Sequence, residues 1–92
     1  MKIKPFPKIL TVVPLKKRRL LVRFNNGESR LYDCRPLLKK FPFTVLKNDS
    51  LFRMVKVDSG GYGVSWNDDL DLSESELWKK GHSYSVDLTV KV

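Results

Sequence analysis

The chain has 92 residues and a mass of 10.7 kDa, which is enough for one hydrophobic core and leaves no room for a second. Hydrophobic residues make up 41% of it, so a modest core can form without a metal, and the single cysteine excludes an internal disulfide. Lysines and prolines interrupt the first residues, and no apolar run approaches the roughly 20 residues of a membrane span. We therefore expect a cytoplasmic protein with neither a signal peptide nor a membrane segment.

The net charge of +8 is distributed unevenly along the chain. Residues 1–47 hold thirteen basic and two acidic residues, whereas residues 48–92 hold five basic and eight acidic residues. The two halves therefore carry +11 and −3. This division predicts a basic side and an acidic side on the folded surface, unless the fold interleaves the two halves.

The elements expected first along the chain are an extended arm, a strand and a basic connection. Prolines favour an extended arm over residues 1–7. Residues 9–13 are rich in β-branched side chains and precede Pro14, which is typical of a strand. The next basic residues form a solvated connection: Lys16, Lys17, Arg18 and Arg19.

A β-hairpin is the strongest local prediction, because residues 20–24 and 28–33 flank an Asn-Asn-Gly sequence. Asn26 and Gly27 suit a two-residue type I′ turn, in which both positions have positive φ. That turn pairs Val22 with Leu31 and places Arg23 and Arg30 on one face of the hairpin. The side chains expected to enter the core are Leu20, Val22 and Phe24.

The middle of the chain predicts a helical turn and a second hairpin. Residues 35–40 form the turn, with Pro36 at its first helical position. Residues 43–52 are open to interpretation apart from a turn at residues 48–50. Residues 54–57 and 62–66 flank a glycine-rich loop, which predicts a hairpin and not a phosphate-binding loop, since such a loop leads into a helix.

A helix and a last strand are expected at the end of the chain. Ser73 and Glu76 have the spacing of a capping box, and Leu77 and Trp78 give the helix its buried side. Gly81 suits a left-handed cap at its end. Residues 84–92 alternate between apolar and polar side chains, as in a strand with one buried face.

Together these elements predict a single α+β domain over residues 1–92. We expect a small antiparallel or mixed sheet of about five or six strands, containing two hairpins, with one or two short helices covering part of it.

The order and spacing of several segments form a distinctive pattern. They are residues 9–13, residues 20–28, Tyr32-Asp33 with residues 36–38, Leu51-Phe52 with residues 55–58, residues 64–66, residues 70–73 and residues 76–78. In this pattern the chain resembles a family of small, mainly bacterial proteins, domain of unknown function 2442, over residues 8–78. The resemblance implies a compact α+β fold without established chemistry. Members are similar to the N-terminal part of some helix-turn-helix proteins, and others look like partners in toxin–antitoxin-type gene pairs.

The chain departs from the family pattern in two places. Residues 67–69 are Asn-Asp-Asp, where the family usually has a proline and a glycine, and residues 81–92 look like an additional strand. The resemblance assigns no catalytic or binding residue to any position of this chain.

Catalytic chemistry is not expected from the side chains that the chain offers. Cys34 and His82 are the one obvious nucleophile and base, but they fall on separate elements and no nucleophile elbow surrounds the cysteine. The acidic residues 67–73 alternate as in a calcium loop, but Leu72 and Trp78 stand where an EF-hand needs glycine and glutamate. We therefore predict no enzyme activity, no metal and no cofactor.

Charge and exposed surface provide the candidate binding residues. The basic candidates are Lys16, Lys17, Arg18, Arg19, Arg23 and Arg30, and the acidic candidates are Asp68, Asp69 and Asp71. Our leading hypothesis is a non-catalytic protein-binding module, an adaptor or an antitoxin-like subunit, with a protein partner or a second copy of the chain. The alternative is a nucleic-acid-binding regulator that uses the basic half. A solvated surface without a partner is the plainer explanation of the same charges.

Overall fold

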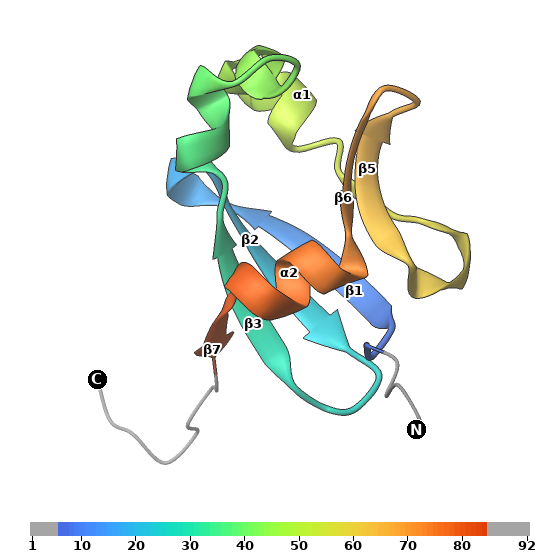
Figure 1. The fold of residues 1–92 in the computed structure, drawn as a ribbon. Helices are drawn as coiled ribbons and strands as arrows, with labels where there is room; N and C mark the ends of the chain where they lie inside the picture. The colour runs from blue at the N-terminus through green and yellow to red at the C-terminus, as the bar shows by residue number, and fades with distance from the viewer. Residues whose placement is uncertain (1–5, 85–92) are drawn as a thin grey trace.

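The computed structural model describes residues 6–84, which form seven strands in two antiparallel sheets (Figure 1). Sheet A has four strands, and sheet B has three. In spatial order, sheet A consists of β1 (Ile9–Leu15), β2 (Arg19–Phe24), β3 (Ser29–Asp33) and β7 (His82–Tyr84). Sheet B consists of β4 (Lys56–Val57), β5 (Gly63–Asn67) and β6 (Leu70–Ser73).

The helical segments are short, and the longest is α2 (Glu74–Lys80), which lies across one face of sheet A (Figure 1). The other helical segments are α1 (Asp49–Phe52) and the 3₁₀ turns η1 (Lys16–Arg18), η2 (Arg35–Lys39), η3 (Phe43–Lys47) and η4 (Ser59–Gly61).

The predicted α+β class with two hairpins is therefore confirmed, with the strands divided between two sheets.

One hydrophobic core lies between α2, sheet A and sheet B. Leu20, Val22 and Phe24 point inward from β2 and are fully buried, as predicted. Leu77 of α2 is buried with them, and the Trp78 ring meets the Phe24 ring edge-on at 5.1 Å between centroids. The predicted inward face of β2 is therefore correct.

The predicted register of the β2–β3 hairpin is wrong by one residue. Val22 pairs with Arg30, and Leu21 pairs with Leu31. The cause is the turn: Gly27 has φ +90°, whereas Asn26 does not have positive φ, so a type I′ turn does not form. The Phe24 carbonyl accepts from the Gly27 amide at 3.1 Å, which gives a three-residue loop in which glycine takes the left-handed position.

The register correction reverses the direction of every side chain on β3, because neighbouring residues of a strand point to opposite faces. Tyr32 points into the core and donates from its hydroxyl to the Glu76 carboxylate at 2.8 Å. Arg30 points to the same face, where its guanidinium lies 3.7 Å from the centre of the Trp78 ring. Leu31 therefore points to the opposite face of sheet A.

The Ser73 half of the predicted capping box is confirmed, whereas the Glu76 carboxylate binds Tyr32 instead of the Ser73 amide, and the predicted cap at the end of α2 is wrong. The Ser73 hydroxyl accepts from the Glu76 amide at 3.1 Å. Gly81 is not left-handed: its φ is −73° and its ψ is 151°, because the chain passes directly into β7. Glycine is required there for space, since a Cβ would lie 2.5 Å from the Leu77 carbonyl oxygen and 2.9 Å from Cβ of Arg30.

Two further segments differ from the sequence-based expectation. β6 was not predicted, because its short alternation, Leu-Asp-Leu-Ser, reads equally well as the approach to a helix. Residues 43–52, whose structure the sequence left open, form η3 and α1, with the Asn48 side chain accepting from the Leu51 amide. The predicted last strand at residues 84–92 lies outside the described residues except for Tyr84.

We predict that Gly81→Ala lowers the free energy of unfolding by about 1–3 kcal/mol, because the added methyl group overlaps backbone and side-chain atoms. Gly81→Asn is expected to destabilise at least as much. Urea denaturation measures both, with Ser83→Ala, an exposed change two residues later on β7, as the control. If Gly81 were a left-handed cap, Gly81→Asn would be more stable than Gly81→Ala, because a left-handed position tolerates asparagine better than alanine.

Candidate functional site

Three of the six basic candidates hydrogen-bond within the fold: Arg19 donates to the nearby Lys16 carbonyl at 3.2 Å, and Arg18 and Arg30 join distant elements. The Arg18 guanidinium donates to the carbonyls of Leu46 and Lys47, at 2.8 and 2.7 Å, and to the Asp49 carboxylate at 2.9 Å. Arg30 donates to the Trp78 carbonyl at 3.1 Å while stacking on that ring. Both guanidinium groups therefore fix neighbouring elements in place, and both are largely covered.

The expectation that Arg23 and Arg30 share one face is wrong. Arg23 pairs with Ser29 and is exposed on the face of sheet A that α2 does not cover, whereas Arg30 lies on the face under α2. The one-residue change in register separates them, because it moves every β3 side chain to the other face.

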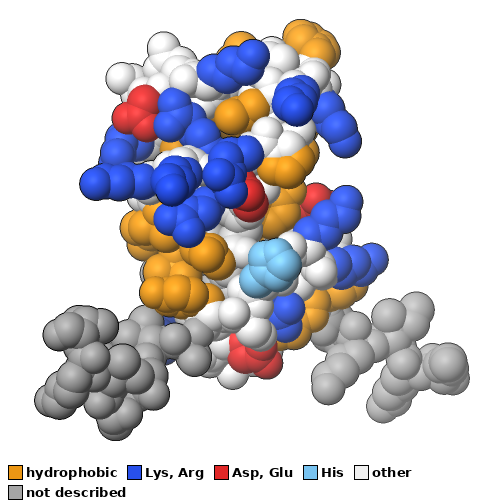
Figure 2. Space-filling model, turned by 90° about the vertical axis from the view of Figure 1, so that its left-hand side faces the viewer, with side chains coloured by type: hydrophobic (Ala, Val, Ile, Leu, Met, Phe, Trp, Pro, Cys, Tyr) orange, Lys and Arg blue, Asp and Glu red, His pale blue; other side chains and the backbone are white. Residues whose placement is uncertain are grey.

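Two of the basic candidates, Lys16 and Lys17, gather with other lysines at one end of the molecule. Arg18 joins η1 to η3 through its hydrogen bonds, and η2 packs against η3, so the cations of these segments share one region. Figure 2 shows basic side chains concentrated over the upper part of this side of the molecule. We call this region the basic end, and its exposed cations without an ion pair to a described residue are Lys16, Lys17, Lys39, Lys40 and Lys47.

The acidic candidates lie on one hairpin of sheet B. Asp68 and Asp69 form the turn between β5 and β6, where the Asn67 side chain accepts from the Asp69 amide at 2.9 Å. Asp71 is exposed on β6 and pairs with Ser65 of β5. The aspartates therefore close a strand turn, and the adjoining helix α2 draws on its own first-turn acids, Glu74 and Glu76.

The face of sheet A opposite α2 carries a row of apolar side chains that crosses three strands. Val13 pairs with Leu21, and Leu21 pairs with Leu31, so the three side chains lie side by side. Val13 is 45% exposed, and the exposed His82 of β7 continues the row beyond Leu31. We call this set, Val13, Leu21 and Leu31, the apolar row.

Mainly polar side chains flank the apolar row on both sides. The neighbouring row contains Thr11, Arg23 and Ser29 and continues to Tyr84 of β7, and the row on the other side contains Arg19 and Asp33 beside Leu15 of β1. Asp33 is held by the Arg35 guanidinium, which lowers the pKa of its carboxyl group, so it remains ionised at neutral pH. In Figure 2 hydrophobic side chains are visible directly below the basic side chains.

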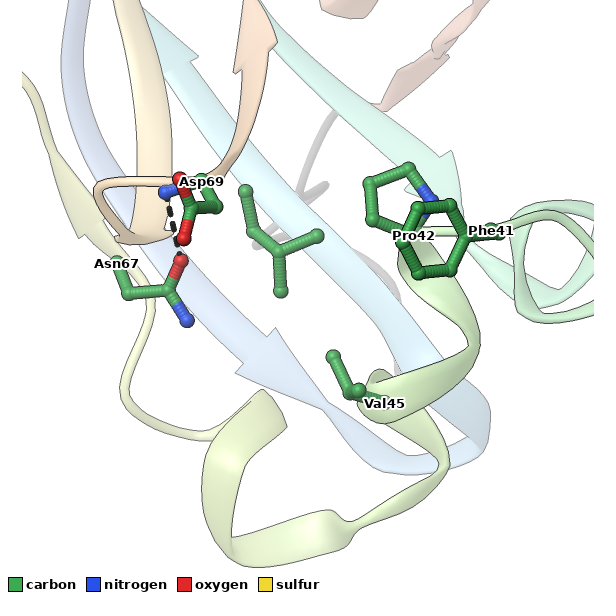
Figure 3. A pocket seen from close by; sticks show the side chains of 6 residues that line it. Phe41, Pro42, Val45, Asn67 and Asp69 are labelled. Carbon is green, nitrogen blue, oxygen red and sulfur yellow. Dashed lines mark hydrogen bonds between the residues drawn. The ribbon is translucent and has the colours of Figure 1, made fainter.

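A separate apolar groove of about 470 Å³ lies between η3 and the β5–β6 turn (Figure 3). Phe41 and Pro42 form one wall, Asn67 and Asp69 lie on the opposite side, and Val45 lies below them. Leu70, which is buried, completes the lining. Phe41 is 90% exposed and Val45 is 48% exposed, so this groove is open to solvent.

A more polar hollow of about 320 Å³ lies beside the bond between Tyr32 and Glu76. Its lining includes Lys40 and His82. Cys34 is buried in the core, and burial, together with the nearby Asp33 charge, raises the pKa of its thiol to about 12. At neutral pH this thiol is protonated and is therefore a weak nucleophile.

We predict that Cys34 reacts with dithiobis(nitrobenzoate) about 1,000-fold more slowly in the native protein at pH 8 than in guanidinium chloride, because a pKa near 12 leaves few thiolate anions. The same shift makes the native state less stable between pH 9 and pH 12, since the thiol of the unfolded chain ionises first and that of the folded chain last. Fast labelling of the folded protein at pH 8 would contradict the buried, protonated thiol.

The geometry defines a small α+β domain whose exposed features are a basic end, an apolar row and an apolar groove. The model of the family "Protein of unknown function (DUF2442)" matches residues 9–83, and the chain belongs to this family. The match runs from the first residue of β1 into β7 and so includes all three features. No curated protein and no solved structure is similar enough to count as a match.

Within residues 6–84, no group of three or more histidine, cysteine, aspartate or glutamate side chains is placed to hold a metal ion. No helix in that part of the chain has the length and apolar character needed to cross a membrane.

Sequence reasoning did not identify the apolar row or the groove. The row depends on the β2–β3 register, which a type I′ turn would have set differently. The groove depends on Phe41. The one sequence signal for this residue is that it is a large aromatic side chain that directly precedes a proline and lies outside any periodic segment.

Proposed function

We propose that this protein is a non-catalytic protein-binding module, an adaptor or an antitoxin-like subunit of the bacterial cytoplasm, that docks a protein partner on the apolar row. The observation that carries this proposal is the alignment of Val13, Leu21 and Leu31 across three adjacent strands on the face of sheet A opposite α2.

The composition of this face supports a docking role. An antiparallel sheet that covers a core on one side normally presents polar side chains on the other. Here apolar side chains occupy consecutive cross-strand positions, and their contiguity distinguishes them from scattered surface residues. Fully burying one such side chain contributes roughly 1.5–3 kcal/mol, whereas an exposed ion pair contributes roughly 0–1 kcal/mol. The apolar row therefore provides affinity, and the surrounding charges provide orientation.

Charge near the row favours a partner with an acidic surface. Arg19 and Arg23 lie on the same face, and Lys16 and Lys17 follow directly after β1 at the basic end. These cations attract an acidic partner before contact and accelerate association at low salt. They also repel a second copy of the chain docked with its basic end alongside, so a different protein suits the face better than self-association.

The buried thiol supports a role without covalent chemistry. Cys34 is protonated and inaccessible, so the one nucleophilic cysteine of the chain serves the core. A reduced, buried cysteine is also compatible with the cytoplasmic location that we propose.

We predict that Val13→Thr combined with Leu31→Thr weakens capture of the partner from a host lysate at least tenfold while sheet A stays folded. Threonine keeps β-propensity but replaces apolar contact by a hydroxyl group. The readout is the amount of one specific co-purified protein after nuclease treatment. Val13→Thr alone, at an exposed and nearly isosteric position, should give a partial loss.

The matched control is Met54→Thr, which changes an exposed apolar residue away from the row. Equal loss of capture in the control and the double variant would indicate a general effect of surface polarity. Unchanged capture in the double variant would place docking elsewhere, and a doubled mass in light scattering that the double variant abolishes would identify a second copy as the partner.

A nucleic-acid-binding regulator is the second candidate, and the basic end supports it. Its lysines come from three separate segments, and the two acids nearby, Asp33 and Asp49, are paired with arginines. Such an uncompensated group of cations suits a phosphate backbone.

For this candidate we predict that Lys16→Gln with Lys17→Asn lowers the slope of log affinity against log salt by about two, since each phosphate contact contributes roughly 0.9. Asparagine is chosen at position 17 because φ there is 64°, which it tolerates. Fluorescence anisotropy with duplex DNA and RNA measures the slope. Lys56→Gln with Lys79→Gln removes equal charge outside the basic end and should change it little. Equal slopes for the unchanged protein and the two double variants would rule out a nucleic-acid site at the basic end.

A further inference from the structure

The groove shown in Figure 3 differs from the apolar row in location and in charge. None of its lining residues belongs to sheet A: Phe41, Pro42 and Val45 come from the η2–η3 region, and Asn67 and Asp69 come from the β5–β6 turn. A molecule in the groove would therefore leave the apolar row accessible.

We propose that this groove binds an extended segment of a partner protein that carries a bulky apolar side chain next to a lysine or an arginine. The apolar side chain fits between Phe41, Val45 and Leu70, and its basic neighbour lies beside Asp69. This inference goes beyond the role of the apolar row, because it assigns a second surface and a partner of the opposite charge.

The size and lining of the groove define the apolar half of the segment. A volume of about 470 Å³ lies at the lower end of the range for ligand sites, and it is large enough for a leucine or an aromatic side chain. Phe41 is 90% exposed in the free domain, which is unusual because aromatic side chains are normally buried against other apolar groups. Aromatic side chains in such open positions are typical anchors of protein interfaces.

The acidic turn defines the charged half of the segment. The Asn67 side chain accepts from the amide of Asp69 and thereby fixes the turn, while both aspartates at its tip are exposed. The described ion pairs of the chain include neither Asp68 nor Asp69, so their charge is available to a ligand. A cationic side chain on this side of the groove gains attraction, whereas an anionic one is repelled.

The acidic candidates of the sequence therefore acquire a specific location. Asp69 lines the groove and Asp68 precedes it in the turn, whereas Asp71 does not line it. This difference provides a matched pair of variants with the same chemical change, Asp69→Asn and Asp71→Asn.

The test uses two capped peptides as probes, acetyl-Gly-Leu-Arg-Gly-amide and acetyl-Gly-Leu-Glu-Gly-amide, titrated into the isotope-labelled full chain and followed by amide NMR shifts. We expect the arginine peptide to bind weakly and to shift the amides of Phe41, Val45 and Asp69. The glutamate peptide should bind at least threefold more weakly, as expected for the loss of an exposed charge interaction.

Variants separate the two halves of the proposal. Phe41→Ala should weaken the arginine peptide about tenfold, because the anchor loses its apolar contact, while Met54→Ala, a comparably exposed change outside the groove, leaves it unaffected. Asp69→Asn should weaken it two- to fivefold and remove the preference for arginine over glutamate, and Asp71→Asn should do neither.

Three outcomes would overturn the proposal. Peptide shifts that fall outside the groove would place binding elsewhere, and equal affinity for both peptides would remove the charge selection. A concentration-dependent dimer that Phe41→Ala abolishes would show that the groove holds a second copy of the chain. Failure of these experiments leaves the apolar row untouched, since Val13→Thr and Leu31→Thr report on that face alone.

Discussion

The register between β2 and β3 is the constraint on which the rest of the structure depends. Gly27 adopts φ +90° in a three-residue loop, and this one position sets which residues of the two strands face each other. The register brings Tyr32 to Glu76 and Arg30 to Trp78, so it also fixes how α2 docks on sheet A. The alternative register would reverse β3, expose Tyr32 and bury Leu31, and it would separate α2 from both of its polar contacts on the sheet.

Local patterns in the sequence predicted the elements well where a side-chain alternation or a cap defines them. The inward face of β2, the second hairpin and the Ser73 cap follow from residue spacing, and each is present. The same patterns were insufficient at Gly27 and Gly81. An Asn-Gly pair is compatible with two loop lengths, and a glycine after a helix serves either a left-handed φ or a close contact, which depends on a residue as distant as Arg30. The candidate surfaces were harder still, because they arise from pairing between strands and from the approach of distant turns.

The fold redistributes the charges of the basic N-terminal half and the acidic C-terminal half of the sequence. Five of the thirteen cations of the N-terminal half lie exposed at the basic end, whereas Arg18 and Arg30 join elements of the fold. Among the acids of the C-terminal half, Asp68 and Asp69 lie in the β5–β6 turn, and Glu74 in the first turn of α2 is bonded to Lys8 at 2.7 Å. Two surfaces of opposite sign therefore remain, one beside the apolar row and one beside the groove.

The fluorescence of the two tryptophans of this chain reports on two different parts of the fold. Trp66 is buried and its indole N–H donates to the Phe52 carbonyl at 2.9 Å, so its emission reports on the joint between sheet B and α1. Trp78 lies against Phe24 and beneath the Arg30 guanidinium, so its emission reports on the seating of α2. Because the two indoles differ in solvent contact and in nearby charge, detachment of the helix and melting of the whole domain are spectroscopically separable events.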